Sequence, residues 1–164
     1  MHDRRKLREG LAARLKTEIG VLVGDRVYAG RLAALDAGTE LPAIMVDVAR
    51  SKAVLFDQQT SALRRAYEAT VTILVRGPDT DLAEPEESYA DILDELALQV
   101  EVCLARDSVL YDKLGIRLID WLFVDDVASA KGPLAPGAIA SLTLRYHAVL
   151  VTPTAIRSPK ETAP

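Results

Sequence analysis

The chain has 164 residues, a formal net charge of −4 and a single cysteine. This length suits one domain, which buries about 70% of the surface of its unfolded chain. One cysteine excludes an intramolecular disulfide, so a reducing cytoplasm is the expected compartment. The near-balanced charge does not indicate a nucleic-acid-binding surface, and we expect neither a secretory signal nor a membrane span, because no apolar run approaches ~20 residues.

An amphipathic helix is expected over residues 4–19. Apolar side chains recur every four residues along it, at Leu7, Leu11, Leu15 and Ile19. This spacing places them on one face of a helix, and Gly20 and Gly24 predict its end. Basic residues crowd residues 4–16 and acidic residues crowd residues 79–101, so the two helices expected in this chain differ in charge.

Two short strands are expected after the first helix. The first covers residues 27–29, and a loop over residues 30–40 follows it. Pro42 pushes the residue before it toward extended geometry, and residues 43–49 then alternate, with Ile44, Val46 and Val48 on one face. Residues 51–65 leave two interpretations open. Val54, Leu55 and Phe56 favour a strand, whereas the polar run from Gln58 to Ser61 favours a turn or a projecting arm.

The clearest pattern is the alternation of apolar and polar residues over residues 67–76 and 138–151. The apolar positions are Tyr67, Ala69, Val71, Ile73 and Val75 in the first segment, and Ala140, Leu142, Leu144, Tyr146, Ala148 and Leu150 in the second. A period of two predicts half-buried strands. The sheet is therefore expected to be covered on one side and to leave a polar side free.

A second helix is expected to begin near Pro85. Its apolar stripe consists of Tyr89, Ile92, Leu93, Leu96, Val100, Cys103 and Leu104, which are spaced three and four apart. Residues 116–124 then predict one further strand. Glycine and proline predict a loop over residues 125–137.

The expected fold is α+β, with a single mixed or antiparallel sheet and both helices packed on its apolar face. Residues 1–151 are expected to form one domain and residues 152–164 a flexible C-terminal tail. A doubly wound dinucleotide-binding fold is disfavoured, because the strands and helices do not alternate and no glycine-rich turn follows the first strand.

No residue group indicates catalysis, and we assign no catalytic, cofactor-binding or metal-binding residues. Cys103 lies on the apolar stripe of the second helix, so a core position is favoured over a nucleophile. His147 lies on the polar side of its strand without evident partners. Asp125 and Asp126 fit a solvated turn better than a cation site, which needs several more oxygen ligands. An enzyme is therefore not expected.

Two short stretches resemble a known family. Residues 25–31 read DRVYAGR and residues 41–46 read LPAIMV. Together they resemble the opening of the tail terminator proteins of long-tailed bacteriophages, the minor tail protein U group. The likeness extends over residues 4–151 as an order of elements: a short amphipathic helix, an alternating strand, an Asp-rich helix and a closing alternating strand.

This resemblance implies a virion structural protein that needs no cofactor. Members of the family form a hexameric ring at the head-proximal end of the tail tube, stop tube polymerisation and offer a surface for joining to the head. The partners implied are further copies of the chain, the tail tube protein and the head-tail connector or neck protein. DNA passes through the ring without specific binding and no membrane is involved. The protein would be made in the host cytoplasm and reside in the virion tail.

The free polar side of the sheet and the segments 51–65 and 125–137 are the candidate assembly interface. The candidate residues are Phe56, Gln58, Gln59, Arg64, Glu68, Thr70, Thr72, Asp125, Asp126, Lys131, Thr143, Arg145 and His147. Two alternatives stay open. Another neck or tail assembly protein, such as a head-completion or tube-initiation subunit, shares this plan, and a small-ligand-binding domain would use the open sheet face.

Overall fold

The computed structural model of the chain describes residues 3–30, 35, 40–57, 62–77, 89–106, 110–111, 117–119, 121–131 and 138–153. Its helices are α1 (Asp3–Ile19), continued by the short 3-10 turn η1 (Gly20–Val23), and α2 (Tyr89–Arg106). Its strands are β1 (Val27–Ala29), β2 (Ala43–Asp57), β3 (Ala62–Arg76), β4 (Leu110–Tyr111), β5 (Arg117–Ile119), β6 (Trp121–Lys131) and β7 (Ile139–Pro153).

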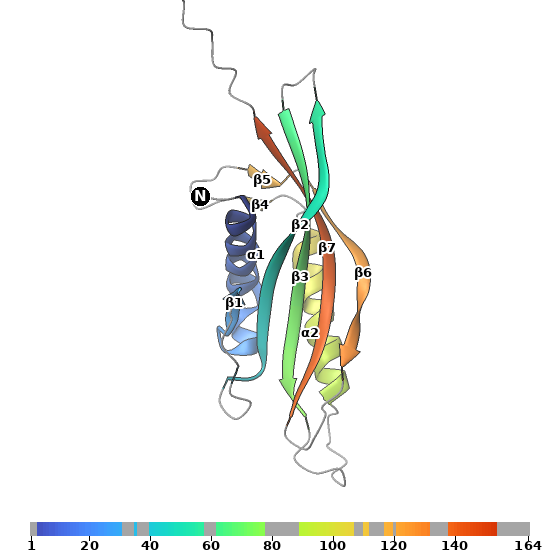
Figure 1. Cartoon of the computed structure of the whole chain (residues 1–164). Coiled ribbons are helices and arrows are strands. Elements are labelled where there is room, and N and C mark those ends of the chain that lie inside the picture. Colours follow the sequence, from blue (N-terminus) through green and yellow to red (C-terminus); the bar gives the residue numbers. More distant parts are fainter. Residues whose placement is uncertain are drawn as a thin grey trace, which may run out of the picture.

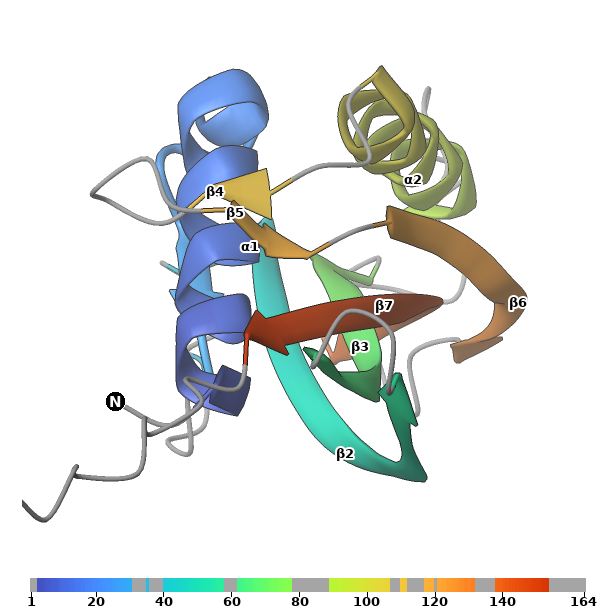
Figure 2. The same cartoon turned by 90° about the horizontal axis from the view of Figure 1, so that it is seen from above.

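The architecture is two layers, a five-stranded sheet and a pair of helices on one of its faces (Figures 1 and 2). The strand order is β1-β2-β3-β7-β6. The β1–β2 pair is parallel and the other neighbours are antiparallel, so the sheet is mixed. A separate antiparallel pair, β4–β5, lies by the start of α1 (Figure 1). The α+β expectation is confirmed.

The first helix ends where its glycines predict. Gly24 has a φ of +56° and follows the η1 turn, and the amide of Asp25 donates to the carbonyl of Gly20 at 2.7 Å. A left-handed residue after the last turn satisfies helix carbonyls that would otherwise lack donors. Leu7, Leu11 and Leu15 are fully buried, as the four-residue spacing predicts.

The alternation in β3 and β7 sets which face of the sheet is buried. All five apolar positions of residues 67–75 are buried, as are those from Ala140 to Ala148. They pack in one cluster with Leu11, Leu15, Leu96 and Val100, and partly buried Ile92 packs against that cluster. Antiparallel pairing places Val71 opposite Leu144, so the apolar rows of the two strands coincide. The side chain of Leu150 lies outside the described residues.

Three strands run well beyond the helices. Residues 51–57 of β2, 62–66 of β3 and 149–153 of β7 together form an extension that we call the arm (Figure 1). Of the two interpretations left open for residues 51–65, the strand is confirmed through Phe56. The polar run from Gln58 to Ser61, which favoured a turn or a projecting arm, lies outside the described residues. β7 includes Thr152 and Pro153, so this strand ends later than expected.

Two sequence predictions in the C-terminal half are wrong. Residues 116–124 are not one strand, because β5 pairs with β4 while β6 pairs with β7. Residues 125–131 are not a loop but the greater part of β6. The pairing register of β6 shifts twice, after Val124 and after Val127. Such bulges break the period of two, and an edge strand tolerates polar residues, so the pattern did not show this strand.

The second helix buries the expected stripe. Leu93, Leu96, Val100, Cys103 and Leu104 are buried, and Tyr89 and Ile92 are partly buried. Its expected start near Pro85 lies outside the described residues.

Candidate assembly surface

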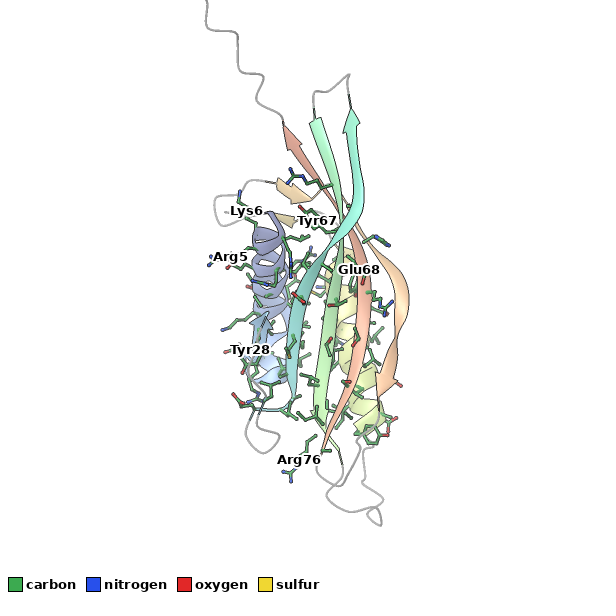
Figure 3. The ribbon with its side chains drawn as sticks, viewed as in Figure 1. Arg5, Lys6, Tyr28, Tyr67, Glu68 and Arg76 are labelled. Carbon is green, nitrogen blue, oxygen red and sulfur yellow. The ribbon has the colours of Figure 1, made fainter. Side chains whose placement is uncertain are left out.

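The polar side of β3 and β7 faces away from both helices. Figure 3 shows consecutive residues of β3, Tyr67 and Glu68, on opposite faces of the sheet. The residues that alternate with the core are half-buried or exposed; on the candidate positions they are Glu68, Thr70, Thr72, Thr143, Arg145 and His147. We call this surface the polar face of the sheet.

The structure pairs these six candidates across the two strands. Glu68 lies opposite His147, Thr70 opposite Arg145 and Thr72 opposite Thr143. The hydroxyl oxygens of Thr72 and Thr143 are 3.2 Å apart and share a hydrogen bond. Cross-strand neighbours of this kind stabilise a sheet by a few tenths of a kcal/mol to about 1 kcal/mol each. The polar face therefore has one side-chain hydrogen bond across the two strands, between Thr72 and Thr143, and places the other candidates opposite one another by backbone pairing.

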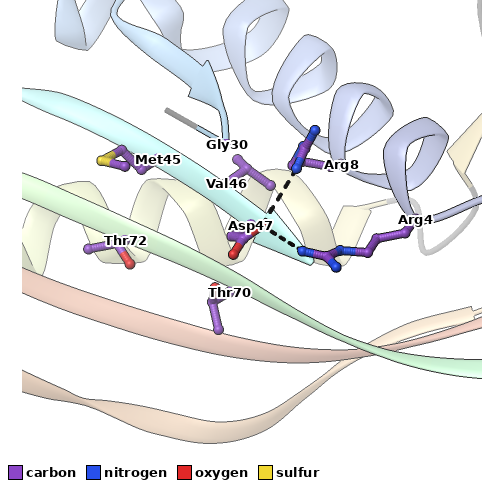
Figure 4. Close-up of a pocket in the computed structure, with 8 residues that line it drawn as sticks. All are labelled: Arg4, Arg8, Gly30, Met45, Val46, Asp47, Thr70 and Thr72. Atoms are coloured by element: carbon purple, nitrogen blue, oxygen red, sulfur yellow. Dashed lines mark ion pairs between the residues drawn. The ribbon is translucent and has the colours of Figure 1, made fainter. Parts of the chain in front are cut away.

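A groove of about 210 Å³ opens at the β2 side of this face (Figure 4). Its lining residues are Arg4, Arg8, Gly30, Met45, Val46, Asp47, Thr70 and Thr72. Arg4 and Arg8 reach over from α1 toward the carboxylate of Asp47, with guanidinium-to-carboxylate distances of 4.0 and 3.8 Å. Both distances exceed hydrogen-bond length, so the ion pairs are weak and partly solvated.

Gly30 makes room for Arg8 in this groove. It has a φ of +66°, and its amide donates to the carbonyl of Val46 at 2.9 Å. A Cβ atom at this position would lie only 2.7 Å from Nη1 of Arg8. The Nε atom of Arg8 is buried and has no hydrogen-bond partner among the described residues. Buried donors are nearly always paired in folded proteins, so this unpaired nitrogen costs some stability where it lies.

No pattern in the sequence indicates the groove, because each of its lining residues is ordinary on its own. Arg4 and Arg8 are four apart and therefore share a helix face, and Asp47 falls on the outward side of its strand. The packing of α1 across β2 brings Arg4, Arg8 and Asp47 together, and no local sequence pattern predicts that packing. Thr70 and Thr72 are the two candidate residues that also line the groove.

The remaining candidates lie away from the centre of the polar face. Phe56 and Arg64 belong to the arm, whereas Gln58 and Gln59 lie outside the described residues. Asp125, Asp126 and Lys131 lie on β6, which is an edge strand of the sheet. Asp126 is the backbone partner of Arg145, and Lys131 is the partner of Ser141.

Cys103 occupies a core position. Its side chain is buried, and Arg14 of α1 donates a hydrogen bond to its backbone carbonyl at 2.7 Å. Burial raises the pKa of the Cys103 thiol to about 11, and the neighbouring Glu18 contributes to this rise. The thiol is therefore protonated at neutral pH, and a thiolate is the form that reacts as a nucleophile.

Two further properties concern the described part of the chain. Among these residues, no group of three or more His, Cys, Asp or Glu side chains is placed to hold a metal ion. No helix within the described ranges is long and apolar enough to cross a membrane.

Comparison with models of protein families and with curated proteins finds no match to this chain.

Proposed function

We propose that this protein is a phage tail terminator, a ring-forming structural protein that caps the tail tube and stops its growth. The observation that carries the proposal is the long sheet with a polar face, covered by helices on the other face only. A sheet face that neither helix covers can supply the contact area that an interface between subunits needs. The element order that resembles the terminator family adds support.

In this proposal six copies form a ring at the head-proximal end of the tube. One side of the ring mimics the next tube ring closely enough to add to the growing end, while the other side lacks the surface that recruits a further ring. The other side meets the head-tail connector or neck protein. The polar face and the arm supply these contacts. A net charge of −4 suits a ring through which DNA passes without being bound.

Reconstitution with the cognate tube protein tests the proposal. Tube protein is polymerised with and without this chain, and tube lengths and numbers are measured by electron microscopy. We expect shorter tubes that carry the chain at one end. Tubes of the same unregulated length, with none of the chain in the pelleted material, would contradict a terminator role.

A matched pair of variants locates the contact surface. Thr143→Arg changes the polar face, and Thr17→Arg changes an exposed position on α1. We expect the first variant to lose capping by roughly tenfold or more, as for a charge buried at an interface, and the second to cap normally. The same assay separates the alternative assembly role, because a tube-initiation subunit increases the number of tubes.

A further inference from the structure

The outer edge of β2 becomes free where β1 stops. β1 pairs with β2 from Ile44 to Val46, and the amide of Gly30 then donates to the carbonyl of Val46. Beyond Val46, no strand within the described ranges pairs with this side of β2. The backbone donors and acceptors of such an edge can take up a strand from another chain.

The first free donor of this edge is capped by a neighbouring side chain. The even-numbered residues of β2 bond toward β1, and the bonding side alternates along a strand, so the backbone of Val48 also points outward. Its amide donates to Oδ1 of Asp47 at 2.8 Å. The guanidinium groups of Arg4 and Arg8 lie 4.0 and 3.8 Å from the same oxygen (Figure 4). The Asp47 carboxylate therefore closes the start of the free edge.

The opposite edge of the sheet is free at the same level. Backbone pairing runs from Val48 through β3 and β7 to Val124 on β6, and likewise from Arg50 to Leu122. The register shifts of β6 begin after Val124, so residues 121–124 pair regularly with β7. No described strand pairs with their outer side. The same alternation, carried from strand to strand, makes Leu122 and Val124 the residues whose backbone points outward.

The directions of the strands suit a contact between these two edges. The strands β2, β3, β7 and β6 alternate in direction across the sheet. A second copy set beside the first without a shift along the strands therefore brings β6 and β2 together antiparallel, which is the more stable kind of pairing. In this register Val48 lies opposite Val124 of the next copy, and Arg50 lies opposite Leu122. All four residues point their backbone groups into the junction, so they match as hydrogen-bonded pairs.

We propose that the β6 edge of a second copy adds to the β2 edge, and that the Asp47 carboxylate holds this contact closed in the free subunit. The occupant is a second copy because one chain carries both edges, matched in level, direction and backbone alternation. The carbonyl of Val124 in the second copy needs the Val48 amide that Asp47 now occupies. Contacts between unlike edges close into a ring when each step is a rotation without rise. This inference rests on the ring in the proposed function and supplies its copy-to-copy contact.

Removal of the cap tests the proposal without any tube protein. Asp47→Ala frees the Val48 amide, and we expect this variant to self-associate roughly tenfold more strongly than the wild type, because a charged acceptor no longer competes. Thr70→Ala changes the same groove without touching the β2 edge, so it is the matched control and should associate like the wild type. Association is measured by sedimentation velocity up to about 1 mM, where even millimolar affinity is visible.

Proline at the partner edge shows whether the added association uses β6. In the Asp47→Ala chain, Val124→Pro removes an outward amide that pairing with β7 does not use, so we expect association to fall to the wild-type level or below. Thermal melts followed by circular dichroism check that each variant folds, and Leu122→Pro is the substitute if Val124→Pro does not. If Asp47→Ala itself does not fold, the proline is placed in the wild type, whose weaker association it should abolish.

An Asp47→Ala variant that associates no more strongly than the wild type, or that still associates with proline at the β6 edge, overturns the contact. Normal capping of tubes by Val124→Pro would also overturn it while leaving the terminator role intact. Association that Val124→Pro abolishes, together with a wild type that has no effect on tube growth, would leave the contact standing and contradict the terminator role.

Discussion

Gly30 shows how a single residue holds the groove open. Its positive φ is strained for any residue with a Cβ atom, and the guanidinium of Arg8 occupies the space in which that atom would lie. The position therefore carries two constraints, one from the backbone and one from a neighbouring side chain.

The first residue-scale prediction is that Gly30→Ala lowers the free energy of unfolding by about 1 kcal/mol or more. Urea unfolding measures the loss. In a chain that already carries Arg8→Ala, Gly30→Ala meets no clash but still has the backbone strain. The loss of unfolding free energy caused by Gly30→Ala should therefore be smaller in the Arg8→Ala background than in the wild type. Equal losses in both backgrounds would mean that Arg8 does not pack on Gly30.

The second residue-scale prediction separates the two faces of β3. Val71→Asp buries an unpaired charge in the core, and we expect it to cost several kcal/mol and to unfold the domain. Thr72→Asp, one residue along, lies on the polar face and should cost about 1 kcal/mol or less, since it loses only the hydrogen bond to Thr143. Thermal melts followed by circular dichroism compare them, and similar melting temperatures would contradict the face assignment.

Sequence patterns predicted individual core residues well because burial alone decides them. Tyr67, Val71 and Leu144 follow from the period of two, and Leu11 follows from the period of four. Arg8 could not be placed in the same way. Its environment comes from Gly30 and from a carboxylate on another strand, which are brought together only by the packing of α1.

At the scale of elements, the strands are much longer than the helices that cover them. Fifteen residues of β2, β3 or β7 span roughly 50 Å at the rise of a strand. α1 and α2, with 17 and 18 residues, span roughly 26 Å. The arm is the excess, and the described core residues nearest to it are Tyr67 and Ala148.

We predict that the arm can be shortened without unfolding the domain. Replacing residues 55–64 by Asn-Gly joins Val54 to Arg65 through a two-residue turn suited to an antiparallel hairpin. We expect the melting temperature to change by only a few degrees, because the core cluster is untouched, and tube capping to be lost. Loss of the cooperative melting transition would show instead that the arm stabilises the core.

The ends of the long strands and the edge strand β6 could not be predicted from the sequence. The period of two fades on the N-terminal side of residue 67, where the strands leave the core and no longer need an apolar side. β6 has two register shifts, and Asp125 and Asp126 suggest a turn when only local preference is considered. Pairing with β7 overrides that preference, and pairing is a property of the sheet.

At the scale of the whole molecule, the two edges of the sheet differ. One edge is the short strand β1, next to α1 and the basic groove, and the opposite edge is the bulged strand β6 (Figure 2). Unlike edges allow a heterologous contact, in which one edge of a copy meets the opposite edge of the next. This polarity fits the proposed ring, in which every copy presents the same surfaces to the tube and to the neck.

The arm lies apart from the described core residues, so the residues that stabilise the fold and the residues of the arm are different sets. None of the described core residues lies in the arm, so we expect substitutions there to be less constrained than those in the core. If a partner surface drifts over generations, the arm can follow it while the core stays fixed. We therefore expect homologous sequences to differ most in the arm, at residues 51–57, 62–66 and 149–153. We expect them to conserve the buried residues of the sheet, such as Ile44 and Leu144.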